Sequence, residues 1–124
     1  MIPRYRAWDK EFKEMVQVDA LVFEEQIIKA TYKNGNVVKE DLKNYVLMQS
    51  TGLKDKNGKE IFEGDIIDST DGFLTGVIEF RVSLGMFVSD LVEYNSFERL
   101  CNVASSRKII GNIWEHPELA EVSS

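Results

Sequence analysis

The stretch from Leu47 to Ile67 constrains the fold most, because it sets strong turn residues between two apolar segments. Asn57-Gly58 lies at its centre, and these two residue types best tolerate the positive φ values of a type I′ hairpin turn. Gly52 and Gly64 flank the turn and predict a bend or bulge on each side. The stretch therefore predicts a β-hairpin, around which the rest of the chain is interpreted.

Two more dipeptides, Asn34-Gly35 and Asp71-Gly72, predict hairpin turns elsewhere in the chain. Over 19–30 the apolar residues also partly fit the spacing of a helix, which is the competing interpretation. Strands are favoured there because a tight hairpin turn at Asn34-Gly35 requires a strand on both sides. Short runs rich in β-branched and aromatic residues predict the strands, at 4–8, 15–18, 19–23, 26–32, 37–38, 64–68, 73–81, 86–88 and 107–114.

This pattern predicts a mainly β protein with an N-terminal β meander and a C-terminal SH3-like curled β barrel. The meander, with a polar connector over 39–44, is assigned to residues 1–44, and the barrel to residues 45–124, although one compact unit also fits. Gly76 and Gly85 would supply the kinks that curl such a sheet. One or two short helices are expected, one over 97–104 behind Ser96 as N-cap and one turn beginning at Pro117.

Composition limits the kinds of partner and the cellular compartment that are expected for the protein. The 124 residues include 15 basic and 21 acidic side chains, and the net charge of −6 opposes nonspecific binding to nucleic-acid phosphates. No apolar run reaches the roughly 18 residues of a membrane-spanning helix, and the N-terminal residues do not resemble a signal peptide. A single cysteine, Cys101, excludes an intrachain disulfide and suits a reducing cytoplasm.

One basic and aromatic patch near the N-terminus is a candidate site for single-stranded nucleic acid, which such proteins hold with cations and stacking rings. Its members are Arg4, Tyr5, Arg6, Trp8, Lys10 and Lys13, with Phe12 nearby. The competing interpretation makes the aromatic residues core and the basic residues an ordinary solvated face. The acidic net charge favours that second interpretation.

No catalytic, cofactor or metal site is predicted. Asp65, Asp68 and Asp71 recur at every third position, but alternation along a strand turns neighbours apart, so solvated turn carboxylates are expected. His116 is the only histidine, and its place beside Pro117 suggests packing or capping. Cys101 lies at helical spacing from Phe97 and Ala104, which suggests a small buried side chain and not a nucleophile.

Three blocks resemble the YopX family of phage and prophage proteins, in that family's order: Arg4 to Lys10, Leu47 to Ile67, and Ile110 to Leu119. Ser50 stands where the family usually has an aromatic residue, and His116 where asparagine is usual. The resemblance implies a cytoplasmic protein in a bacterial host, and it brings no catalytic residues.

The hypothesis from the sequence is a noncatalytic, self-associating interaction module with an unknown phage or host protein as partner. The alternative is an accessory nucleic-acid-binding protein that uses the N-terminal patch. A homo-oligomer is expected if Ile27 to Tyr32, which carries one charge and no strand breaker, is an open edge that pairs with a second copy. The competing interpretation makes this segment a central strand, covered by its own domain.

Overall fold

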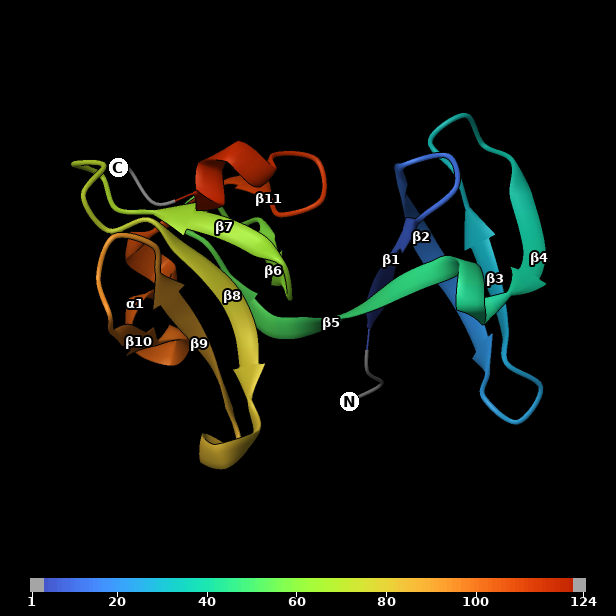
Figure 1. The fold of residues 1–124 in the computed structure, drawn as a ribbon, viewed down its shortest axis with the longest axis horizontal. Coiled ribbons are helices and arrows are strands. Elements are labelled where there is room, and N and C mark those ends of the chain that lie inside the picture. Colours follow the sequence, from blue (N-terminus) through green and yellow to red (C-terminus); the bar gives the residue numbers. More distant parts are fainter. Residues whose placement is uncertain (1–3, 122–124) are drawn as a thin grey trace. The chain divides into compact units, whose positions relative to one another are not determined.

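The computed structural model describes residues 4–121 and confirms the mainly β class (Figure 1). The strands are β1 (Tyr5–Asp9), β2 (Glu14–Val22), β3 (Ile27–Thr31), β4 (Val37–Asp41), β5 (Tyr45–Lys54), β6 (Glu60–Phe62), β7 (Asp65–Asp68), β8 (Gly76–Arg81), β9 (Met86–Leu91), β10 (Phe97–Arg99) and β11 (Lys108–Asn112). The helices are α1 (Leu100–Val103) and the 3-10 helices η1 (Leu42–Asn44), η2 (Val82–Leu84), η3 (Ala104–Ser106) and η4 (Pro117–Ala120).

The chain forms two compact units, residues 1–49 and 50–124, and the boundary falls inside β5. The polar stretch 39–44, which the sequence offers as a connector, contains the end of β4 and η1 and lies within the first unit.

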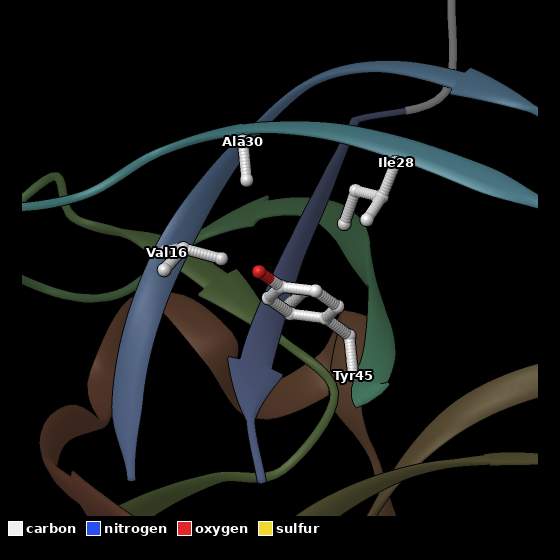
Figure 2. Close-up of a cluster of buried hydrophobic side chains, with 5 residues drawn as sticks. Val16, Ile28, Ala30 and Tyr45 are labelled. Atoms are coloured by element: carbon white, nitrogen blue, oxygen red, sulfur yellow. The ribbon is translucent and has the colours of Figure 1, made fainter. Parts of the chain in front are cut away.

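The first unit is an antiparallel meander in the order β4-β3-β2-β1-β5. Strands β1 to β4 follow one another through short turns, and β5 pairs with β1 on the other side of the sheet. The buried cluster on this sheet consists of Ala7, Val16, Ile28, Ala30 and Tyr45, four of which are labelled in Figure 2. Ile28 and Ala30 face the cluster because they are two residues apart on β3.

Of the two interpretations of Ile27 to Tyr32, an open edge or a central strand, the structure supports the central strand. β3 pairs with β2 on one side and with β4 on the other, so its backbone groups are used within the unit. The edge strand is β4, whose Lys39, Glu40 and Asp41 are exposed and charged. Charged side chains on an edge discourage further strand pairing.

The asparagine–glycine turns also differ from the expected type I′. Gly35 donates its N–H to the Tyr32 carbonyl and Gly58 donates to the Asp55 carbonyl, at 2.9 and 3.0 Å. Both glycines have positive φ, but the only non-glycine residues of 4–121 with positive φ are Lys13 and Gln26, so Asn34 and Asn57 do not have it. A type I′ turn needs positive φ at both central residues, whereas a type I turn followed by a left-handed glycine needs it only at the glycine.

The second unit holds a five-stranded antiparallel sheet in the order β10-β9-β8-β7-β11, and β6 pairs with the second half of β5. β11 returns from the end of the chain to pair with β7. Within residues 4–121 the order is open, with β10 and β11 at its two ends, so the sheet is not a closed barrel. Its buried cluster consists of Ile61, Ile67, Ile78, Leu100 and Ala104.

The expected helix over 97–104 is shorter and begins later. Phe97 lies on β10, and α1 starts after Arg99, so Ser96 is not its N-cap. Leu100 and Ala104 are buried, whereas Cys101 is exposed, contrary to the expectation of a buried cysteine. The reason is that a helical step of about 100° turns position 101 away from the face that carries 100 and 104. The turn beginning at Pro117 is present as η4.

We predict that Ile28→Lys unfolds the first unit and does not dissociate an oligomer. Ile28 is fully buried, and an unpaired ammonium there should lower the unfolding free energy by roughly 4 kcal/mol or more. Thermal melts measure the effect, with Val37→Lys on the exposed start of β4 as the control. A folded Ile28→Lys protein that melts like the control would contradict this packing.

A second prediction concerns the close approach of β8 and β9. A Cβ built on Gly76 would lie 1.8 Å from Ser89 Oγ and 3.2 Å from Ser89 Cβ. The Ser89 hydroxyl is buried and has no hydrogen-bond partner in the structure. Gly76→Ala should therefore cost about 2 kcal/mol, while Ser89→Ala should be nearly neutral.

Chemical denaturation of the two single variants and the double variant measures their coupling. Because Ser89→Ala removes the clashing oxygen, the double variant should be more stable than the sum of the single effects predicts. Additive losses would mean that the clash is not between these two side chains.

Candidate functional site

The structure separates the members of the N-terminal patch. Tyr5, Arg6 and Trp8 lie on β1, where alternation sends Tyr5 to the face opposite Arg6 and Trp8. Trp8 is 8% exposed, so its ring is not a stacking platform. Burial of Trp8 is what the core interpretation of this residue expects.

The remaining members lie outside the strand. Arg4 precedes β1 and is exposed, and Lys13 is exposed in the β1–β2 turn, where its φ is 54°. Lys10 Nζ donates to the Lys43 carbonyl at 2.9 Å. Phe12 is exposed in the same turn as Lys13. The six residues therefore do not share one exposed face.

The three regularly spaced aspartates serve the local backbone. Asp65 is buried and accepts the Phe62 N–H at 2.8 Å, so it is not the solvated turn carboxylate that the sequence suggests. Asp68 accepts the Ser69 N–H, and Asp71 accepts the Phe73 N–H. Within residues 4–121 no group of three or more His, Cys, Asp or Glu side chains is placed to hold a metal ion.

His116 has a packing role. Its Nδ1 accepts the Asn112 N–H at 3.2 Å, and its ring lies so close to Gly111 that a Cβ there would be 2.6 Å from Nδ1. The Asn112 side chain accepts the N–H groups of Trp114 and Glu115 and so shapes the same turn. Because Nδ1 is held by the backbone, His116 is poorly arranged to activate a nucleophile.

Asp55 is a buried carboxylate at the start of the central turn. Its Oδ1 accepts the N–H groups of Asn57 and Lys59, both at 2.9 Å, and its Oδ2 accepts the Ile109 N–H at 3.0 Å. Burial alone would raise the pKa of Asp55. The three backbone hydrogen bonds and the Lys59 charge outweigh burial, so the pKa of Asp55 lies below its ordinary value.

A second polar network, absent from the sequence analysis, joins four strands of the first unit. The Tyr32 hydroxyl donates to Asp9 Oδ2 at 2.5 Å and lies 2.6 Å from the Tyr45 hydroxyl, which in turn lies 3.1 Å from Glu40 Oε2. Burial, then the bond to Asp9, raises the pKa of Tyr32 well above its ordinary value. The two hydroxyls act as donors to the carboxylates of Asp9 and Glu40.

The β8–β9 hairpin carries three exposed apolar side chains around η2. Pairing of β8 with β7 ends at Val77, and pairing of β9 with β10 begins at Val88, so the last residues of the hairpin extend alone to η2 (Figure 1). Val82 is 83% exposed, Phe80 43% and Leu84 41%. We call Phe80, Val82 and Leu84 the hairpin tip.

Phe80 links the hairpin tip to the buried core of the second unit. Phe87 packs against the buried cluster of the second unit, and Phe80 pairs with it across the strands. The two rings are 5.0 Å apart at 66°, an edge-to-face arrangement. Phe80 is therefore held in place while much of its ring faces solvent, and the sequence signal for it is the apolar alternation at 80, 82 and 84.

Comparison with known proteins shows to which family the chain belongs. The family described as "YopX protein" matches residues 4–121. The chain belongs to the YopX family. The YopX resemblance of the three sequence blocks is thus confirmed, and it extends over nearly the whole chain.

Two solved structures are similar to this YopX-family chain. Protein EF1440 from Enterococcus faecalis is 33% identical with a TM-score of 0.67, and the match covers 98% of this chain and 99% of that chain. Protein yopX from Bacillus subtilis has a TM-score of 0.58 at 24% identity, covering 94% of this chain and 96% of that chain, which supports the fold alone. Comparison with curated proteins gave no match.

The Asp55 geometry yields a pH prediction. A carboxyl whose pKa is lowered by folding stabilises the protein above its unfolded pKa of about 3.9, and this stabilisation is lost as the pH falls through the lower folded value. Asp55→Asn should therefore be destabilised by about 2 kcal/mol at pH 7 relative to the natural sequence, and the gap should shrink below about pH 4.

Urea denaturation across this pH range measures the gap. The control is Glu25→Gln, which removes an exposed turn carboxylate. A gap between Asp55→Asn and the natural sequence that is the same at pH 3 and pH 7 would contradict the role given to the ionised Asp55.

Proposed function

We propose that this YopX-family protein is a noncatalytic protein-interaction module of phage or prophage origin that acts in the bacterial cytoplasm. The observation that carries the proposal is the exposed apolar tip of the β8–β9 hairpin. An apolar side chain such as Val82, held far from its own core on a two-stranded extension, gains most by burial against another protein.

The geometry of the hairpin supports this role. Phe80 is anchored by Phe87, so little side-chain freedom remains to be lost when a partner covers it. A rigid aromatic anchor beside exposed aliphatic residues is the composition of many interface hot spots.

The polar groups support a noncatalytic role. Asp9, Asp55 and Asp65 are buried, and each accepts backbone N–H groups that fix turns. His116 is occupied by the Asn112 N–H. These contacts give the four groups structural roles. No helix in residues 4–121 is long and apolar enough to cross a membrane.

Self-association by strand pairing at β3 is no longer expected, because both sides of β3 are already paired. A second copy of the chain is instead one possible partner for the hairpin tip. Nucleic-acid binding through the N-terminal patch is weakened as an alternative because Trp8 is buried.

The test is site-specific photocrosslinking in a bacterial host that expresses the protein. A photoreactive residue at position 82 should give a discrete adduct that is absent when the same residue is at position 37, an exposed valine of the first unit. The adduct partner, purified, should bind the natural sequence at least tenfold tighter than it binds Val82→Asp.

Equal binding of the natural sequence and Val82→Asp would remove the hairpin tip as the interaction surface. Adducts at position 37 with none at position 82 would do the same. Tight binding of labelled single-stranded DNA at low salt, abolished by Arg4→Ala, would favour the nucleic-acid alternative.

A further inference from the structure

We propose that Asn57 is a site of spontaneous deamidation and that the equivalent residue of the first unit, Asn34, is protected. This modification site goes beyond the proposed function and does not involve the hairpin tip. The two asparagines occupy matching positions in matching turns, so each serves as the comparison for the other.

The two turns share sequence and backbone. Lys33-Asn34-Gly35 and Lys56-Asn57-Gly58 have the same three residue types, and all six residues are exposed. In each turn the residue before the tripeptide accepts the glycine N–H, at 2.9 Å in the first turn and 3.0 Å in the second. The same residue donates its own N–H, at 2.8 Å in both turns, to the carbonyl that follows the tripeptide. A difference in reactivity must therefore come from the side chains.

The asparagine side chains differ because the residue that begins each turn differs. In the first turn Asn34 Oδ1 accepts the Asn36 N–H at 2.9 Å. In the second turn the equivalent N–H belongs to Lys59, and Asp55 Oδ1 accepts it at 2.9 Å. Within residues 4–121 the structure gives the Asn57 carboxamide no hydrogen bond. That carboxamide can therefore rotate toward the next backbone nitrogen without losing a bond.

The reaction needs only this rotation and one water molecule. The Gly58 nitrogen bonds to Asn57 Cγ, the Cγ–Nδ2 bond breaks, and ammonia leaves with the amide hydrogen of Gly58. Water then opens the cyclic imide. Attack at Cγ gives aspartate with the natural main chain, whereas attack at the main-chain carbonyl carbon gives isoaspartate. Glycine favours ring closure because it has no Cβ to block the approach.

Isoaspartate at position 57 would weaken the attachment of β11. It inserts one carbon into the main chain between the Asn57 and Lys59 N–H groups, which share Asp55 Oδ1 as their acceptor. The other oxygen of Asp55 accepts the Ile109 N–H at the start of β11. A lengthened turn separates these donors from the carboxylate, so conversion to isoaspartate should destabilise the second unit.

The test is incubation of the folded protein at mildly alkaline pH, followed by cleavage after glutamate and tandem mass spectrometry. Cleavage releases segments 26–40 and 41–60, each of which holds one of the two turns. We expect aspartate and isoaspartate to accumulate at Asn57 about fivefold faster than at Asn34, which corresponds to the ~1 kcal/mol of one net hydrogen bond. In denaturing urea the two rates should become equal, because the tripeptides are identical.

Matched variants connect the modification to stability. During incubation the urea midpoint should fall in the natural sequence and in Asn34→Gln. It should stay constant in Asn57→Gln, whose longer side chain would have to close a larger ring. Asn57→Asp carries the charge of the product on the natural main chain, so it should unfold at the midpoint of the unincubated protein.

Each remaining outcome overturns a stated part. Equal rates in the folded protein would mean that the bond to Asn36 does not protect Asn34, and a faster rate at Asn34 would mean that this bond activates its carbonyl. A preference for Asn57 that persists in urea would remove the turn as its cause. Deamidation in urea alone would mean that the glycine hydrogen bond blocks both folded turns. An unchanged midpoint after conversion to isoaspartate would remove the destabilising role.

Discussion

The second unit depends on one buried carboxylate. Asp55 accepts two N–H groups from its own turn and a third from Ile109, which lies 54 residues further along the chain. The Lys56 N–H adds a bond to the Arg107 carbonyl at 2.8 Å. Together these bonds fix the start of β11 against the β5–β6 turn, and β11 then pairs with β7. A neutral side chain at position 55 could not satisfy three backbone donors at once.

The sequence predicted much of the fold because local chemistry decides it. Alternating apolar residues marked most of the strands, and the glycines at 35, 58 and 72 marked turns that are present. The type of turn could not be inferred, since asparagine supports either backbone through its side chain: Asn34 Oδ1 accepts the Asn36 N–H at 2.9 Å. Whether β3 is an edge or a central strand could not be decided from the sequence, because strand order is set by pairing partners that the segment itself does not specify.

The candidate site was less predictable for a related reason. The N-terminal patch was proposed from spacing in sequence, but alternation on β1 separates Tyr5 from Arg6 and burial removes Trp8. The hairpin tip was overlooked because Phe80 was assigned to the predicted strand 73–81, while Val82 and Leu84 fell in the turn before the next strand. The neighbouring strands are short: β7 pairs with β8 as far as Val77, and β10 pairs with β9 from Val88, which leaves this part of the hairpin without a neighbouring strand.

The position of β11 has a consequence for how the protein folds during synthesis. The first unit is closed by pairings between consecutive strands and β1 with β5, all within the first 49 residues, so a nascent chain can complete it early. The second unit must wait for β11, because the β7–β11 pair closes a loop of about 40 residues near the end of the chain. Until then β7 keeps one side open, and the third donor of Asp55 is missing. The interval before β11 emerges from the ribosome is therefore when this chain is most exposed to misassociation.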